Sequence, residues 1–183
     1  NKAAQEMVER VASLIGKDSA KSVHLSTFHS LGNRILRKDI HHLGYRKPFT
    51  ILDDADQLAI IKAAFKDLNL DPKVVDPKRI LYLLGRAKMA FKEPANLPGF
   101  KFDPDIPFAQ RVYRQYVAAL KGLNAVDFDD LICLPVQLFR DFEPIRQKYA
   151  RIYQYVMIDE FQDTNHTQLM FAHELVKDHN NIC

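Results

Sequence analysis

Apolar residues at regular intervals predict helices and strands in the first part of the chain. Over residues 4–15 they recur every three or four positions, as on one face of a helix, and Gly16 can end that helix in a left-handed conformation. Val23 and Leu25 alternate with polar residues, which predicts a short strand. Helical spacing returns over residues 31–36, so this part predicts the order helix, strand, helix.

Residues 41–122 carry helical patterns and almost no strand signals. Asp54 with Gln57 three residues later resembles a capping box at a helix start, and a second helix is predicted to begin at Asp76. Four prolines within residues 92–107 predict a long irregular connection to a third helix. The pattern therefore predicts an all-helical unit inserted between two outer parts.

After the insertion, the alternation of helix and strand returns. A helix is predicted from Asp127 with a bend at Pro135, and a short one from Pro144. Residues 152–158 form an apolar run that predicts a buried strand, and helical spacing follows over residues 169–176. Outer parts of this kind predict an α/β fold with a parallel sheet, interrupted by the helical insertion. The predicted parts are residues 1–40, 41–122 and 123–183.

Composition narrows the class of protein. The 183 residues are 47% hydrophobic, enough for a buried core, and the net charge of +3 permits nucleic-acid binding without predicting it. Charged residues interrupt every apolar run well before the ~20 residues of a membrane span, so we expect no membrane partner and a cytoplasmic location. Cys133 and Cys183 have no cysteine or histidine at metal-ligand spacing, which argues against a zinc site and a disulfide framework.

The clearest candidate chemistry follows the predicted strand, in the string VMIDEFQDTN at residues 156–165. The carboxyl ends of parallel strands open into the crevice where α/β domains bind ligands. Magnesium takes few protein carboxylates and keeps several waters, so Asp159 can anchor it through water while Glu160 acts as a general base. Nucleotide hydrolysis needs this division of labour. The alternative is structural, because acidic residues often end strands, and residues 163–165 can cap the next helix.

The longer string DEFQDTN resembles the second conserved motif of the superfamily 1 DNA helicases of the UvrD, Rep and PcrA type. Its glutamine and its DTN ending separate that family from the DEAD-box and DEAH-box helicases. The resemblance implies that Asp159 anchors Mg²⁺ and that Glu160 is the catalytic base. It also implies that Gln162 is a catalytic sensor near the γ-phosphate that links the nucleotide site to DNA.

Three further strings resemble motifs of this family in the correct order. NKAAQEMVER at residues 1–10 resembles motif Ia, STFHS at residues 26–30 resembles motif Ib, and VDFDDL at residues 126–131 resembles motif Ic. In the family these segments contact single-stranded DNA. The DNA contacts that the resemblance implies are Asn1, Lys2, Thr27, His29 and Phe128.

The residue types in these strings suit DNA contact. Ser26 or Thr27 can begin a helix whose first N–H groups bind phosphate, and the ring of His29 adds a donor. Phe128 can offer an aromatic face to a base. The alternatives are an ordinary histidine, a buried phenylalanine and, for Asp127 and Asp130, a role in capping a helix. Phe28 is expected to pack inward.

The resemblance covers the whole chain and implies its fold and activity. The fold is a partial RecA-like P-loop NTPase domain, interrupted by a helical subdomain. The activity is ATP- and Mg²⁺-dependent movement from 3′ to 5′ on single-stranded DNA, with unwinding at single-strand to duplex junctions. Basic residues of the insertion offer a path for duplex phosphates, with a solvated helix face as the alternative. They include Lys73, Lys78, Arg79, Arg86, Lys88 and Lys92.

The phosphate-cradling pattern GxxxxGK followed by Ser or Thr does not occur in the sequence. The nearest fragment, Gly16-Lys17, lacks both the upstream glycine and the hydroxyl. The chain also begins with Asn1 rather than Met. We therefore expect a piece of a longer helicase that binds no ATP or Mg²⁺ stably and has no ATPase or unwinding activity of its own.

Two other functions fit the sequence, and one physical property follows from it. The chain can be a non-catalytic module that binds DNA or docks a protein through its helical insertion, or part of a related helicase-nuclease. In the family's fold the P-loop strand lies beside the strand predicted at residues 152–158. Without that neighbour we expect an exposed apolar edge and self-association of the chain.

Overall fold

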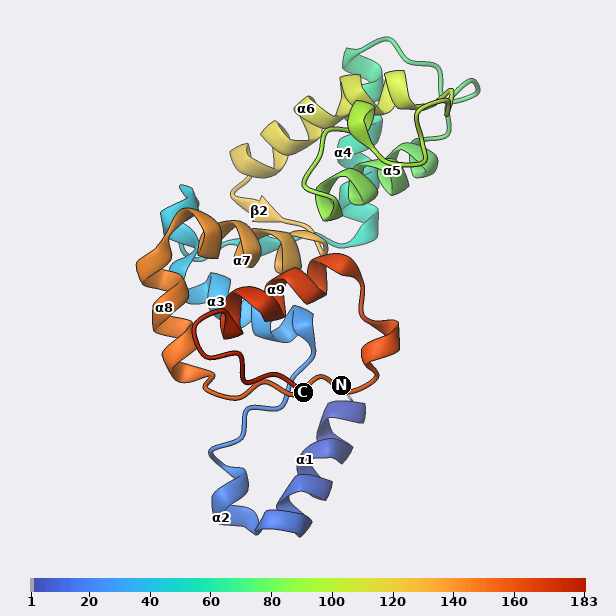
Figure 1. Ribbon diagram of the computed structural model, residues 1–183. Helices are drawn as coiled ribbons and strands as arrows, with labels where there is room; N and C mark the ends of the chain where they lie inside the picture. The colour runs from blue at the N-terminus through green and yellow to red at the C-terminus, as the bar shows by residue number, and fades with distance from the viewer. Residues whose placement is uncertain (1) are drawn as a thin grey trace.

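The computed structural model describes residues 2–183, with side chains from residue 6 onward. Figure 1 shows a helical lobe made of α4, α5 and α6 above a central body made of α3, α7, α8 and α9, with α1 and α2 at the opposite end. The α-helices are α1 (Lys2–Ile15), α2 (Lys17–Ala20), α3 (Phe28–Asp39), α4 (Asp54–Asp67), α5 (Pro77–Met89), α6 (Ile106–Gly122), α7 (Asp130–Asp141), α8 (Glu143–Ile152) and α9 (His166–Val176). The 3₁₀ helices are η1 (Ile40–Leu43), η2 (Pro94–Asn96) and η3 (Phe161–Asp163).

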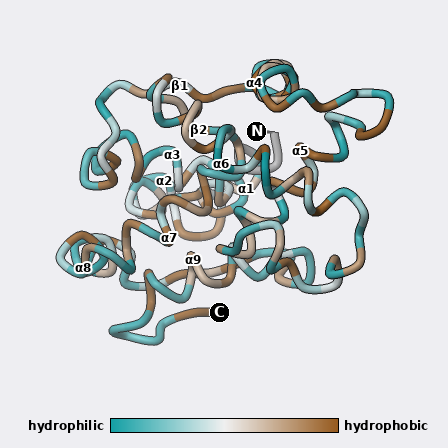
Figure 2. The backbone as a smooth tube through the Cα atoms, turned by 90° about the horizontal axis from the view of Figure 1, so that it is seen from above, coloured by the Kyte–Doolittle hydropathy of each residue, from teal (hydrophilic) through white to brown (hydrophobic). Residues whose placement is uncertain are grey.

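The central body forms because its helices each carry an apolar stripe. In Figure 2 teal and brown alternate along the helical parts of the tube, as expected of helices with one side on a core. Ile35 of α3, Phe139 of α7 and Phe171 of α9 are fully buried in one cluster. The α3–α7 crossing is close, because a Cβ at Gly32 would lie 1.7 Å from the carbonyl oxygen of Leu131. Glycine is therefore required at this crossing.

The helical lobe has its own buried cluster, which includes Ile61 of α4, Leu84 of α5 and Val112 of α6. Its predicted helices are present, and Asp76 caps α5 through a hydrogen bond from the Lys78 N–H at 2.9 Å. Residues 92–105 are irregular except for η2. The lobe is helical, but the predicted all-helical range of residues 41–122 also contains the short strand Thr50–Ile51.

The predicted capping box of α4 is wrong by one residue. The side chain of Asp53 accepts the Asp56 N–H at 2.8 Å, and the side chain of Asp56 accepts the Asp53 N–H in return. Gln57 is instead buried inside the lobe. A carboxylate at the third helical position reaches back to the cap as glutamate or glutamine does, so this start is displaced from the Asp54 and Gln57 pair.

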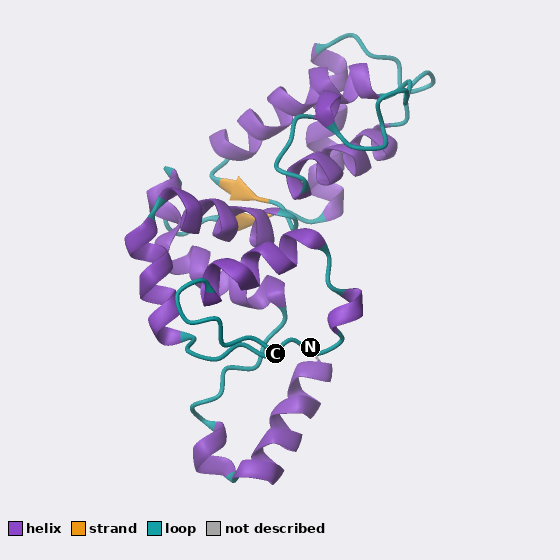
Figure 3. Ribbon diagram, in the orientation of Figure 1, coloured by secondary structure: helices purple, strands orange, loops and turns teal. Residues whose placement is uncertain are grey.

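A small parallel sheet joins the lobe to the central body. β1 (Thr50–Ile51) precedes the lobe and β2 (Ala125–Val126) follows it, with Thr50 paired to Ala125 and Ile51 to Val126. Both are drawn in orange in Figure 3, between the lobe and the body. Among the described residues this is the whole of the named sheet, so the structure is mostly helical rather than built on the larger parallel sheet that was predicted.

Of the two strands predicted from periodicity, the first is absent and the second is reduced to a short pairing. Residues 23–27 are irregular, and α8 continues to Ile152. In the remainder of the predicted strand, Val156 makes a single parallel bridge to Ile182, while Tyr155 and Met157 are 76% and 79% exposed. A strand forms only where a neighbouring strand takes up its N–H and C=O groups, and in the described part of the chain residues 181–183 alone do so here.

Candidate functional site

The start of α3 has the geometry predicted for it. Thr27 is the N-cap, and its Oγ1 accepts a hydrogen bond from the Ser30 N–H at 3.2 Å. The Thr27 hydroxyl also lies 3.0 Å from Ser30 Oγ. The N-terminus of this 12-residue helix carries the positive end of the helix dipole, which favours an anion such as phosphate.

His29 and Phe128, which lie far apart in the sequence, stack on each other. Their ring centroids are 4.1 Å apart with an interplanar angle of 26°. Phe128 is 55% exposed, so it is no core residue, whereas Phe28 packs inward toward Phe171 as predicted. Burial holds the pKa of His29 below its usual value of 6.5. The pair forms an aromatic surface beside the start of α3, and its contact with DNA stays a prediction.

A groove of about 960 Å³ lies beside Phe128, between the helical lobe and the start of α9. Tyr82 and Arg86 of α5 line one side, and Asn165 and Thr167 line another. Asn165 belongs to the DEFQDTN string, so this string and the Phe128 segment meet at one groove.

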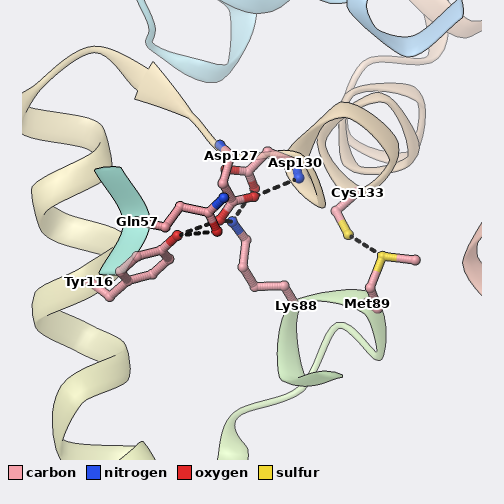
Figure 4. A network of polar contacts seen from close by, with 7 residues as sticks. All are labelled: Gln57, Lys88, Met89, Tyr116, Asp127, Asp130 and Cys133. Atoms are coloured by element: carbon pink, nitrogen blue, oxygen red, sulfur yellow. Dashed lines mark hydrogen bonds and ion pairs between the residues drawn. The ribbon is translucent and has the colours of Figure 1, made fainter. Parts of the chain in front are cut away.

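Figure 4 shows a buried ion cluster that includes Asp127, the residue before Phe128 in the sequence. The Nζ of Lys88 is 2.5 Å from Asp127 Oδ2 and 2.7 Å from Asp130 Oδ1, and the three side chains are 8%, 2% and 6% exposed. The hydroxyl of Tyr116 lies 2.9 Å from Asp127 Oδ2 and 3.1 Å from Gln57 Oε1. We call these five residues the Lys88 cluster.

The Lys88 cluster bears on the predictions for Lys88 and for the two aspartates. Lys88 is no surface cation for duplex phosphates, because both of its ion pairs are buried inside the protein. Asp127 and Asp130 close the turn that precedes α7, because each accepts the other's backbone N–H, at 2.9 and 3.2 Å, whereas the N-cap Asp129 makes no side-chain cap. Burial raises the pKa of Asp130, and the neighbouring charge of Asp127 adds to the rise, while Lys88 opposes it.

The acidic segment of residues 159–163 is exposed along its whole length. Asp159 Oδ1 accepts the Glu160 N–H at 3.0 Å, and the Gln162 side-chain amide donates to the Glu160 carboxylate. Glu160 has φ 52° and ψ 45°, in the left-handed region that non-glycine residues seldom adopt. These three side chains thus lie together, but the contacts found for them are local.

Asn165 is the N-cap of α9, the structural role predicted as the alternative for residues 163–165. Its side chain accepts the Gln168 N–H at 3.0 Å and the Gln168 side chain accepts the Asn165 N–H at 3.0 Å, a full capping box for α9. Asp163 and Thr164 make no cap of this kind, since Asn165 itself is the N-cap.

The donor chemistry of Asp159 suits magnesium held through water. A carboxylate oxygen is the ligand type that Mg²⁺ prefers, and the second oxygen of Asp159 can accept from a metal-bound water. No group of three or more His, Cys, Asp or Glu side chains in the described part of the chain is arranged to hold a metal directly. Within the same residues, no helix is both long and apolar enough to cross a membrane.

The comparison with known protein families covers the whole sequence. Residues 1–183 match the family model described as the UvrD/REP helicase N-terminal domain. The chain belongs to this family. Membership confirms the resemblance drawn from the four sequence strings.

The curated relatives of this UvrD/REP family member are much longer proteins. The ATP-dependent DNA helicase PcrA of Bacillus subtilis (strain 168) is 41% identical over 186 residues, and that of Leuconostoc citreum is 38% identical over 182 residues. PcrA of Staphylococcus aureus (strain Mu50) is 37% identical over 183 residues. All of this chain is covered each time, but only 25%, 24% and 25% of the relatives. The chain therefore spans about a quarter of their length.

Reasoning from the family motifs missed the buried residues gathered around Asp127, next to Phe128 in the sequence. Asn1 and the side chain of Lys2, two predicted DNA contacts, lie outside the described part of the structure. The missed residues are Lys88, Tyr116 and Gln57. A signal was present for Lys88, because it follows Ile80, Leu84 and Ala87 on the buried stripe of α5, where a charge needs a buried partner.

Proposed function

We propose that this chain is part of the motor of an ATP-dependent DNA helicase that moves 3′ to 5′ on single-stranded DNA and unwinds duplex at junctions. Residues 1–40 and 123–183 are assigned to a RecA-like domain and residues 41–122 to its insertion. The observation that carries the proposal is the exposed stack of His29 on Phe128 beside the start of α3. Two strings that resemble DNA-contact motifs thus form one surface.

The surface has the parts that single-strand binders combine. The exposed face of Phe128 can stack on a base, which is sequence-tolerant because every base has a π face. His29 packs against the Phe128 ring from the side of α3. The free N–H groups in the first turn of α3 can donate hydrogen bonds to the adjoining phosphate. Single-stranded DNA bound in this way is held through its phosphate backbone and by base stacking, and neither depends on the DNA sequence. A motor that moves along any sequence requires contacts of this kind.

The acidic segment is assigned to the nucleotide end of the same motor. Asp159 would hold Mg²⁺ through water, Glu160 would accept a proton from the attacking water, and Gln162 would orient Glu160 through their contact. Bound Mg²⁺ would neutralise charge on the ATP phosphates. The sequence lacks the phosphate-cradling pattern, so the chain alone is proposed to turn over no ATP.

The DNA surface is tested by anisotropy of a labelled single-stranded oligonucleotide. Phe128→Ala should weaken binding about 5- to 150-fold, because stacking is worth about 1–3 kcal/mol per base. Phe102→Ala, which removes a 91% exposed phenylalanine elsewhere in the lobe, is the matched control and should change little. Binding that survives Phe128→Ala but is lost on neutralising Lys78 and Arg86 would favour a DNA-binding module based on the insertion.

The nucleotide assignment is tested by DNA-stimulated ATP hydrolysis. The chain is compared with a longer protein that carries the remaining motifs of the family, and with the Glu160→Gln variant of that protein. Turnover by the longer protein alone, abolished by Glu160→Gln, is the expected result. Turnover by the short chain, or an active Glu160→Gln variant, would contradict the role of Glu160.

Self-association is proposed for the segment predicted as a strand. Ile152, Tyr155, Met157 and Phe161 are 57%, 76%, 79% and 57% exposed, an unusual concentration of apolar side chains on a surface. We expect a second copy of the chain to cover them, so the mass from light scattering should rise with concentration and Met157→Lys should lower it. A monomer at high concentration would contradict the proposal.

A further inference from the structure

We propose that Lys88 is a positioning residue for DNA contact: through Asp127 and Asp130 it fixes the loop that carries Phe128. The helical lobe would then control the DNA surface without touching DNA at this point. This inference rests on the proposed function, because it concerns how the proposed base-stacking side chain is held.

Phe128 lies in a short turn whose two ends are closed on each other. It follows β2 and Asp127 and precedes α7, which begins at Asp130. The Asp127 side chain accepts the Asp130 N–H at 2.9 Å, and the Asp130 side chain accepts the Asp127 N–H at 3.2 Å. The turn that contains Phe128 therefore keeps its conformation only while these two carboxylates stay in their positions.

The two carboxylates keep their positions because they share one ammonium group. They are buried, and Lys88 lies 2.5 and 2.7 Å from them. Without Lys88, two buried like charges would repel each other and each would need water. Water can reach them only if the turn opens, and opening the turn moves Phe128 off His29.

The lobe reaches this turn from all three of its long helices. Lys88 comes from the last turn of α5, Tyr116 from α6 and Gln57 from α4, and Figure 4 shows their side chains converging on Asp127. A second observation is independent of these polar contacts. A Cβ at Gly85 would lie 2.7 Å from Asp129 Oδ2, so α5 also approaches the far side of the turn closely.

A direct phosphate contact by Lys88 makes a different prediction from a positioning role. Each phosphate contact that is lost lowers the slope of log affinity against log salt by about 0.7 for single strands. Lys88 is 8% exposed and both of its ion pairs are internal, so its removal should leave this slope unchanged. The affinity itself should fall, because the stacking side chain is displaced.

The test is a double-mutant cycle on single-stranded DNA binding, with a 2-aminopurine oligonucleotide that reports stacking by its fluorescence. Lys88→Met alone should weaken binding about 5- to 150-fold, like Phe128→Ala, and should reduce the 2-aminopurine quench. In the Phe128→Ala background it should weaken binding no further. Tyr116→Phe, which removes one hydrogen bond to Asp127 and keeps the ion pairs, should give a smaller loss with the same lack of additivity.

Leu83→Ala is the matched control for general destabilisation. Leu83 is fully buried on the same helix, in the hydrophobic core of the lobe, and is no member of the Lys88 cluster. A merely structural role of Lys88 predicts equal DNA affinity for Lys88→Met and Leu83→Ala at temperatures where both are folded. The proposed role predicts that Lys88→Met lowers the DNA affinity and that Leu83→Ala does not.

The outcomes separate this inference from the proposed function. If the unaltered chain binds no single-stranded DNA, or Phe128→Ala is silent, the DNA surface itself is wrong. If Phe128→Ala weakens binding, but the affinity losses of Lys88→Met and Tyr116→Phe add fully to that of Phe128→Ala, only the positioning role is overturned. A lower salt slope for Lys88→Met would also overturn it. Should Lys88→Met not fold, Tyr116→Phe decides by the same criteria.

Discussion

Two acidic segments of this chain, residues 126–131 and 159–163, are held in opposite ways. In the first, Asp127 and Asp130 are buried against a lysine from another helix. In the second, Asp159 and Glu160 are exposed, and among the described residues their side chains bond to near neighbours in the sequence. A buried, paired carboxylate has one position, whereas an exposed one keeps its water and its rotamers. The first segment is therefore preorganised by the fold, and the second has freedom to be arranged by a ligand.

The largest expected effect comes from breaking the buried segment. Lys88→Met should lower the free energy of unfolding by about 3–5 kcal/mol, because it leaves two carboxylates buried without their cation. Glu160→Gln should change it by no more than about 0.5 kcal/mol, because the side chain is exposed. Urea denaturation of both variants measures the difference. Equal effects would mean that the two segments are held alike.

A smaller effect of opposite sign is expected in the exposed segment. Glu160 has φ 52°, a conformation that disfavours an L-residue by about 1–2 kcal/mol. Glu160→Gly should remove this strain and, after the greater flexibility of glycine in the unfolded chain, raise the free energy of unfolding by about 0.5–1 kcal/mol. Because Glu160 is the residue proposed to act in hydrolysis, a gain in stability there would support a conformation held for function rather than for folding. A loss on urea denaturation would show that the Glu160 side chain stabilises the segment.

Helices were predictable from this sequence because their signals are local. Periodic apolar residues and caps such as Asp76 and Thr27 lie within one or two turns of each other, and these helices are all present. The strands were not predictable in the same way, because a strand depends on a partner elsewhere in the chain. Thr50–Ile51 pairs with Ala125–Val126 across the whole insertion, whereas the apolar run at residues 152–158 obtains one bridge.

The two aromatic residues of the candidate site could be selected from the sequence, but the buried residues beside them could not. Motif resemblance selected His29 and Phe128, and the structure stacks their rings. The sequence predicts Lys88 to be a surface cation, since charge is ordinarily a sign of exposure. Its place on an apolar helical stripe was the better guide, because a buried charge is tolerated only where its partners are fixed.

The smallest expected effect concerns the pKa of His29, which burial holds below 6.5. Because Phe128 covers one face of the ring, Phe128→Ala should expose it and raise this pKa toward 6.5. Any stability that depends on the neutral ring is complete above pH 6.5, where both folded and unfolded forms are neutral, and is lost as pH falls through the folded pKa.

Proton NMR titration of the imidazole C–H signals measures this shift. His24 is the internal control, because its pKa is also lowered, by burial and by Arg34, but its ring packs on Tyr153 rather than on Phe128. If the pKa of His29 is the same in Phe128→Ala, the stack of the two rings does not persist in solution. Residues 126–131 would then be no better ordered than residues 159–163. A rise in the pKa of His29, with no change at His24, would show that Phe128 covers the His29 ring in solution. The segment that Lys88 buries and orders would then present Phe128 at a fixed position on the surface.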